Sequence, residues 1–295
     1  MAPIRQSMTG LVHGLSKTGK SLMAASLVKP QLYLDVEMGS QFLPLRAVRW
    51  DPDTPPPKPA ETWDTAVVRV KDWSQARRAL DRLLTGAHPF RSVAVDSLGA
   101  LQNRLINKVA GRNAVEIQDW GEILRELLDF TEQLRDLTDH PKHPLLEVLC
   151  TCPTKLDKES GMWMPGLRGQ MATTVPYLFD ITGYLFVEDS YDKASNRTVQ
   201  LRFLRTRRTD KIEAGERVGG AIDPIYRLPM ITGSPAQVME RNKTFQLLRG
   251  KVYAQLTQGI AKPVASENKP PPPAPPAPTE TASAVDAAPS DRKAG

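Results

Sequence analysis

The sequence contains Gly14-Leu15-Ser16-Lys17-Thr18-Gly19-Lys20-Ser21, which follows an apolar segment (7–13) and opens a helical pattern (20–28). The two glycines let the backbone curl so that successive N–H groups face one anion, and the helix N-terminus adds a favourable dipole. In this pattern the lysine contacts the β- and γ-phosphates, and the serine hydroxyl binds Mg²⁺. All eight residues are therefore predicted to bind nucleotide, with Lys20 catalytic, Ser21 a metal ligand, and ATP and Mg²⁺ as cofactors.

Two other apolar segments end in carboxylates. Segment 92–96 ends at Asp96, where an acidic side chain is expected to support the magnesium shell. Segment 31–37 ends in Asp35-Val36-Glu37, and a carboxylate at this point can lie across from the γ-phosphate. Glu37 is therefore predicted to be the general base for an attacking water molecule. Together with the glycine-rich motif, these residues predict an ATPase.

Strand-like and helical patterns alternate along the chain. Strands are expected at 7–13, 31–37, 66–70, 92–96, 145–151, 181–187 and 198–204, and helices at 20–28, 73–85, 98–109 and 115–137. This alternation predicts an α/β fold with a mostly parallel central sheet flanked by helices. Five prolines in segment 51–60 predict a surface loop.

The C-terminal segment has the composition of a disordered tail. Residues 270–278 are mostly proline, and alanine, serine and threonine follow. We expect one ATPase domain at 1–260 and a disordered Pro/Ala-rich tail at 261–295, which either solubilises the protein or tethers a partner. The charges of the tail cancel, so the net charge of +6 belongs to residues 1–260. That charge is compatible with nucleic-acid binding but does not establish it.

Neither a membrane segment nor a disulfide is expected. No apolar run approaches the ~20 residues of a membrane helix, and residues 1–9 lack the apolar core of a signal peptide, so a cytoplasmic location is expected. Cys150 and Cys152 are the only cysteines, and we expect two reduced core residues. A metal site with His140 and His143 is the alternative, although the spacing fits no common zinc pattern.

The order of these motifs resembles the RecA-like recombinase ATPases, and most closely the compact phage-encoded members of that group. The likeness covers residues 8–230 and includes Asp35-x-Glu37-x-Gly39, Val95-Asp96-Ser97, Pro165-Gly166-Leu167-Arg168-Gly169 and the basic run 205–211. It implies a RecA-like fold with Glu37 as the catalytic base. It also implies ATP hydrolysis on single-stranded DNA in phage recombination, annealing or replication, in the host cytoplasm. A single-strand-binding protein and further copies of the chain are additional candidate partners.

Two features depart from that family. Its members usually carry a polar sensor, often His or Gln, after the strand that here ends near Cys152, and this chain offers Thr151 or Thr154. The motif also begins too early for a polymerisation helix to precede it, so the usual recombinase filament is not expected.

Two loops and a basic run are candidates for further contacts. In RecA-like proteins two loops face DNA, one after the helix that follows the Asp96 strand and one after the strand that carries the sensor. There, cations follow phosphates and an aromatic side chain stacks on a base. The candidate DNA contacts are Lys108, Arg112, Lys155, Lys158, Trp163 and Arg168. The candidates for trans-acting fingers at a neighbour's γ-phosphate are Arg205, Arg207, Arg208 and Lys211, with a solvated strand face as the equal alternative.

Three other classes share such a motif. A nucleotide-kinase-like phosphotransferase would use the 205–211 arginines as a lid, but it needs no general base at Glu37. A partitioning-type switch ATPase would carry a lysine at the position of Leu15. A non-catalytic binding module would be favoured if Glu37 lay away from the motif.

Overall fold

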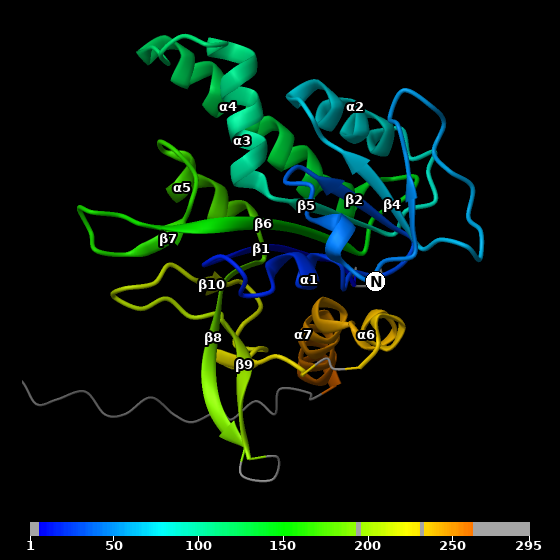
Figure 1. Cartoon of the computed structure of the whole chain (residues 1–295), viewed down its shortest axis with the longest axis vertical. Helices are drawn as coiled ribbons and strands as arrows, with labels where there is room; N and C mark the ends of the chain where they lie inside the picture. Colours follow the sequence, from blue (N-terminus) through cyan, green and yellow to red (C-terminus); the bar gives the residue numbers. More distant parts are fainter. Residues whose placement is uncertain (1–5, 193–195, 231–232, 262–295) are drawn as a thin grey trace, which may run out of the picture.

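A large β-sheet forms the centre of the protein, whose computed structural model describes residues 6–192, 196–230 and 233–261 (Figure 1). Its strands are β1 (Met8–Gly14), β2 (Gln31–Asp35), β3 (Ala47–Arg49), β4 (Thr65–Arg69), β5 (Ser92–Asp96), β6 (Glu147–Leu156), β7 (Trp163–Pro165), β8 (Ile181–Asp192), β9 (Arg197–Arg205), β10 (Gly215–Glu216) and β11 (Ile225–Arg227). The main order is β11-β9-β8-β1-β6-β5-β2-β4-β3, with β10 beside β8 and β7 beside β6.

Neighbouring strands from β8 to β3 run parallel, whereas β7, β9, β10 and β11 pair antiparallel. The predicted α/β fold with a mostly parallel sheet is therefore confirmed. Because carboxyl ends of parallel strands meet at one edge, the ends of β1, β2, β5 and β6 are brought together there. Asp35 and Asp96 are direct neighbours in this register.

Helices cover both faces of the sheet. They are α1 (Lys20–Ala24), α2 (Trp73–Leu84), α3 (Leu98–Ala110), α4 (Ile117–Asp136), α5 (Met171–Thr174), α6 (Pro235–Arg241) and α7 (Thr244–Ala261). Short 3₁₀ turns lie at Ser40–Phe42, Leu137–Asp139 and Val175–Leu178. No helix in the described part of the chain has the length and apolar character needed to cross a membrane.

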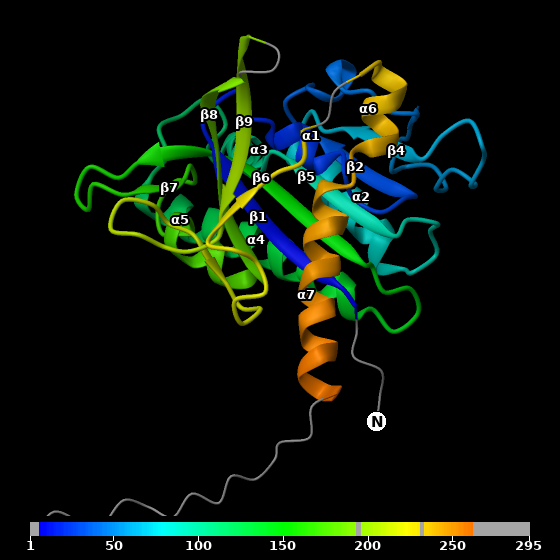
Figure 2. The same cartoon turned by 90° about the horizontal axis from the view of Figure 1, so that it is seen from below.

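Each face of the sheet has its own apolar core. Helices α2, α3 and α4 bury side chains such as Trp73, Leu105 and Phe130 on one face. On the other face, α1 and α7 bury Met23 and Phe245, among others. Figure 1 shows α2, α3 and α4 on one side of the sheet and α6 and α7 on the other, and Figure 2 shows α7 running along the sheet near β1.

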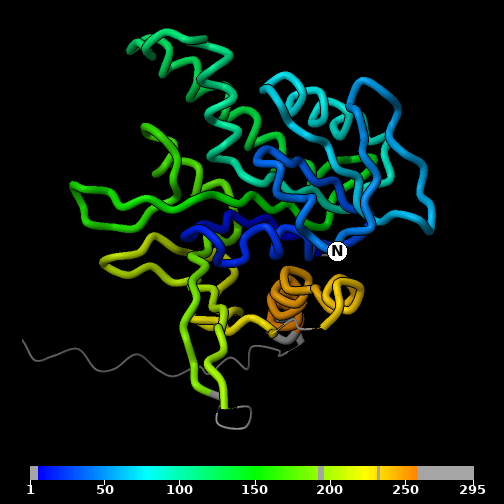
Figure 3. Tube along the Cα trace, viewed as in Figure 1, coloured from blue at the N-terminus to red at the C-terminus, as the bar shows by residue number. Residues whose placement is uncertain are grey.

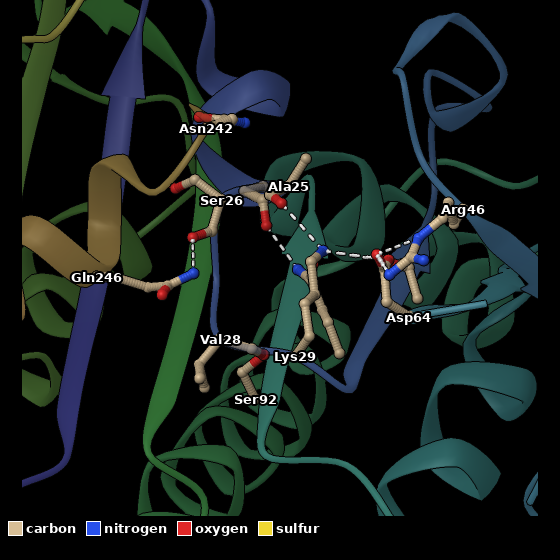
Figure 4. Close-up of polar contacts among 12 residues, drawn as sticks. Ala25, Ser26, Val28, Lys29, Arg46, Asp64, Ser92, Asn242 and Gln246 are labelled. Atoms are coloured by element: carbon tan, nitrogen blue, oxygen red, sulfur yellow. Dashed lines mark hydrogen bonds and ion pairs between the residues drawn. The ribbon is translucent and has the colours of Figure 1, made fainter. Parts of the chain in front are cut away.

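A network of polar contacts fastens α7 to the end of α1 (Figure 4). The amide of Gln246 donates to the carbonyl of Ser26 at 3.0 Å, and the Ser26 hydroxyl accepts the Phe245 N–H at 3.0 Å. Nearby, Lys29 donates to the Ala25 carbonyl at 3.1 Å, and burial lowers the pKa of its ammonium to about 8. The two Ser26 contacts join the last described helix to the turn that follows α1.

Several elements differ from the expectations. The first helix ends at Ala24 instead of residue 28, because Ser26 turns its hydroxyl back onto the Met23 carbonyl and competes with helical hydrogen bonds. Strand β2 ends at Asp35, so Glu37 lies in the loop behind it. Strand β6 continues to Leu156, because it pairs with β7.

The predicted boundary between the domain and the tail, at residues 260 and 261, lies at the end of α7. Ala261, assigned to the tail from composition, is the last residue of α7, and the rest of the expected tail lies outside the described residues. Figure 3 shows that the chain reaches α6 and α7 after the long β8–β9 hairpin, which extends beyond the other strands of the sheet.

Candidate functional site

The glycine-rich motif (residues 14–21, hereafter the phosphate loop) joins the end of β1 to the start of α1. Gly14 has no room for a side chain, because a Cβ would lie 2.3 Å from the Leu185 carbonyl oxygen of β8. Gly19 has a φ of 103°, which favours glycine. Both positions give the loop a physical requirement for glycine that is independent of any ligand.

The loop borders a cavity of about 370 Å³ at the carboxyl edge of the sheet. The residues that line this cavity include Ser21, Lys20, Glu37 and Asp96. The Lys20 ammonium is held by the carbonyls of Gly14 and Leu15, at 2.9 and 2.7 Å. Burial lowers its pKa, while the charges of Asp96 and then Glu37 oppose that shift. The structure therefore places the predicted lysine, base and metal-supporting carboxylate at one cavity, close enough for their charges to interact.

Asp96 is buried, and hydroxyl groups hold both of its carboxylate oxygens. The Tyr33 hydroxyl donates to Oδ2 at 2.6 Å, and the Thr151 hydroxyl donates to Oδ1. Burial, followed by the charge of Asp96, raises the pKa of Tyr33 well above its ordinary value, so its hydroxyl remains a donor. Tyr33 was not identified from the sequence, because it is one of several apolar or aromatic residues in a buried strand.

Glu37 is exposed and lines the cavity, and one contact holds its carboxylate while others hold the loop that carries it. The hydroxyl of Ser97, which follows Asp96 through a cis peptide bond, donates to Glu37 Oε1. Behind it, the Asp35 carboxylate accepts the N–H groups of Gly39 and Ser40 at 3.0 and 3.2 Å. Asp35 is therefore a positioning residue for the loop that carries Glu37.

The two threonines considered as sensors have different surroundings. Thr151 contacts Asp96, as described above, whereas the Thr154 hydroxyl lies 3.1 Å from Nδ1 of His13. His13 Nε2 lies 2.7 Å from the Glu213 carbonyl, which can only accept, so this nitrogen carries the proton. Burial lowers the pKa of His13 to about 4, and the charge of Lys20 contributes.

His13, which the sequence did not single out, thus links the phosphate-loop strand to the β6–β7 hairpin. Thr154 also faces the Met164 carbonyl of β7 at 3.0 Å, so this carbonyl and His13 Nδ1 compete for one hydroxyl proton. An ionisable residue immediately before the loop, in a strand without other charged residues, was the available signal.

The buried state of His13 predicts a pH-dependent stability. Because its folded pKa of about 4 lies below the ordinary 6.5, the unfolded chain binds more protons between these values, and stability falls as pH drops through that window. We expect His13 to lower the free energy of unfolding by about 2 kcal/mol between pH 7 and pH 5. Urea denaturation of the wild type and His13→Gln at both pH values should show a smaller loss in the variant. An equal loss of the free energy of unfolding in the wild type and in His13→Gln would contradict the prediction.

The four finger candidates do not gather at the cavity. Arg208 pairs with Glu213 at 3.4 Å, and Nε of Arg205 is buried without a hydrogen-bond partner among the described residues. Arg207 and Lys211 are exposed. None of the four lines the cavity of the phosphate loop.

The six DNA-contact candidates occupy different surroundings. Lys108 lies 3.7 Å from Glu126 in a separate hollow beside α2, and Arg112 is exposed between α3 and α4. The Lys155 ammonium donates to the Leu167 carbonyl, whereas Lys158 is exposed between β6 and β7.

Trp163 and Arg168 complete the set. Trp163 is half-buried, and its backbone pairs with residues 211 and 213, so it has a structural role in β7. Arg168 is exposed and lines a hollow of about 310 Å³ together with Trp120 of α4. Trp120 is an aromatic neighbour that the sequence analysis did not identify.

The two cysteines are free and fully buried, as expected for reduced core residues. His143 is turned toward the Phe90 carbonyl, at 2.8 Å. Within residues 6–192, 196–230 and 233–261, no group of three or more His, Cys, Asp or Glu side chains is arranged to hold a metal ion. A zinc site built on Cys150 and Cys152 is not supported.

A family model described as "AAA domain" matches residues 6–218. The matched segment includes the phosphate loop, Glu37, Asp96 and the β8–β9 hairpin. No curated protein matches the sequence.

Proposed function

The chain belongs to the AAA domain family of P-loop ATPases, and on that premise we propose that it is a RecA-like, Mg²⁺-dependent ATPase that acts on single-stranded DNA. The observation that carries the catalytic part is the convergence of Lys20, Glu37 and Asp96 on one cavity. A non-catalytic module would not need a carboxylate that a Ser97 hydroxyl contacts, on a loop whose backbone N–H groups Asp35 holds.

The donor set fits a magnesium ion. Ser21 and Asp96 supply a hydroxyl and a carboxylate, and Mg²⁺ is usually held by one or two such oxygens together with substrate phosphates. Asp96 has hydroxyl donors but no cationic partner in ion-pair contact among the described residues, so its charge is available to a cation. When bound, the ion would neutralise charge on the phosphate oxygens.

The side chains have distinct roles in the proposed hydrolysis. Lys20 binds the β- and γ-phosphates, and the loop N–H groups orient the chain of phosphates. Glu37 accepts a proton from a water molecule whose oxygen attacks the γ-phosphorus. The bond between the γ-phosphorus and the bridging oxygen breaks, and ADP and phosphate leave. Ser97 orients the Glu37 carboxylate during this proton transfer.

One assay tests the reaction class. ATP turnover should be measured with and without single-stranded DNA, together with phosphate transfer to nucleoside monophosphates. We expect release of inorganic phosphate that depends on Mg²⁺, and stimulation by single-stranded DNA. Transfer to a monophosphate without net hydrolysis would instead identify a phosphotransferase.

For the DNA contact we propose two elements, the hollow lined by Arg168 and Trp120 and the exposed Lys158 between β6 and β7. Arg168 and Trp120 line one hollow, and together they offer a cation for a phosphate and a ring for a base. Lys155 and Lys108 are less suitable, because a carbonyl and a carboxylate already hold their ammonium groups.

Replacing Lys158 and Arg168 together by alanine should weaken single-strand binding. If each contacts one phosphate, the slope of log K against log salt should fall by about 1.4, since each contact contributes about 0.7 for single strands. The matched control is removal of residues 262–295, whose four basic and four acidic residues cancel. A salt titration by fluorescence anisotropy measures both variants. If the truncation abolishes binding and the double variant does not, the proposed surface is wrong.

The biological setting follows only from the resemblance to phage-encoded RecA-like ATPases. We propose recombination, annealing or replication as the pathway, with a single-strand-binding protein and further copies of the chain as partners. Exposed Arg207 and Lys211 are the remaining candidates for contacts with a neighbouring copy. Molar mass measured by light scattering, with and without ATP and DNA, tests self-association.

A further inference from the structure

An arginine that sequence reasoning did not select lies directly against the phosphate loop. A Cβ added to Gly19 would lie 3.1 Å from Nε and 3.2 Å from Cδ of Arg202. Arg202 belongs to β9, far along the chain, and is half-buried. Its guanidinium is therefore placed beside Gly19, in the loop whose backbone N–H groups would face a bound phosphate.

The alternation of side chains along β9 explains this placement. Leu204, two residues further on, belongs to the apolar core that contains Met23 and Ala24 of α1. Because residues two apart share a face of a strand, Arg202 is directed to the same side of the sheet as α1. Arg205 lies three residues from Arg202 on the same strand, so its side chain is directed to the opposite face.

Arg202 has no ion pair or side-chain hydrogen bond among the described residues, unlike Arg208, which pairs with Glu213. Its cross-strand neighbour is the apolar Val187, and the diagonal neighbour Asp189 forms no ion pair with it. A half-buried guanidinium without an anionic partner is electrostatically unfavourable, and a bound anion would relieve that cost.

We propose that Arg202 is a phosphate ligand of the nucleotide site, supplied in cis by the β8–β9 hairpin. The proposal rests on the nucleotide site of the preceding subsection and extends it. A planar guanidinium binds phosphate oxygens through two parallel hydrogen bonds, which a lysine cannot reproduce. Nucleotide binding would therefore fix strand β9 to the phosphate loop within one subunit, without an arginine from a neighbour.

The test compares nucleotide affinities of three variants by calorimetric titration with ADP and with a non-hydrolysable ATP analogue. Arg202→Ala should weaken binding of both nucleotides by roughly 10-fold or more, the range for a hydrogen bond to a charged group. Arg202→Lys should recover part of the loss. The matched control is Arg197→Ala, which removes the same charge from the same strand about 16 Å away and should bind normally.

Hydrogen exchange provides a readout that a purely structural role would not change. ADP should slow amide exchange around residues 200–204 in the wild type and in Arg197→Ala, but not in Arg202→Ala. Should Arg202→Ala fail to fold, Arg202→Gln keeps most of the side-chain length and decides the question by the same two measurements.

The outcomes distinguish the proposed role of Arg202 from the proposed nucleotide site on which it depends. If the wild type binds no nucleotide, the proposed nucleotide site is wrong. If the wild type binds, Lys20→Ala does not, and Arg202→Ala binds as tightly as Arg197→Ala, the site stands and the role of Arg202 is overturned.

Discussion

Lys20→Ala is expected to reduce ATP turnover by ~10³-fold or more, the range for losing a charged group that contacts the transferring phosphate. Lys20 is the loop side chain whose ammonium is already held at the cavity, by the carbonyls of Gly14 and Leu15. Its charge is coupled to those of Asp96 and Glu37, so alanine also leaves these carboxylates without their cation. Phosphate release under saturating Mg²⁺ measures the effect.

The fold should survive this substitution. Burial lowers the pKa of Lys20, which means that the folded state pays a cost for its charge, and alanine removes that cost together with two hydrogen bonds to carbonyls. Thermal unfolding should therefore remain cooperative and close to the wild type. Lys58→Ala, an exposed lysine in the proline-rich loop, is the control for the charge change. Near-normal hydrolysis by Lys20→Ala would show that residues 14–21 do not hold the reacting phosphates.

Glu37→Gln is expected to lower hydrolysis by ~10²-fold or more while ATP still binds. The amide keeps the size of the carboxylate and can still accept the Ser97 hydroxyl, but it cannot take a proton from water. Single-turnover hydrolysis and nucleotide titration, measured separately, distinguish the chemical step from binding.

Asp96→Asn is the comparison for Glu37→Gln, because it removes a charge from the other carboxylate of the cavity. It should shift the Mg²⁺ concentration needed for turnover, since Asp96 is the proposed support of the ion. If Glu37→Gln hydrolyses ATP normally, Glu37 is not the base, although the phosphate loop could still bind nucleotide.

The sequence by itself determined the fold class and the centre of the candidate site. Each of these signals is local: a glycine pattern between a strand and a helix, and two apolar strands that end in acidic residues. Parallel strand ends meet at one edge, so Lys20, Glu37 and Asp96 had to approach one another once the strands were assigned correctly. Helix α7 was not predicted from the sequence. Phe245, Leu248 and Val252 are buried, but the apolar residues Leu247 and Leu256 are exposed, so the apolar residues do not define a single face of the helix.

Only the tertiary structure decided which other side chains act at that edge. Tyr33 and Thr151 reach Asp96 from two different strands, and His13 meets Thr154 and Glu213 through contacts that span more than a hundred residues. No local pattern carries such information, because the spacing of these residues along the chain says nothing about the order of strands in the sheet. Arg202 shows this most clearly. Its charge could be read from the sequence, but the pairing of β9 with β8, and of β8 with β1, placed it beside the phosphate loop.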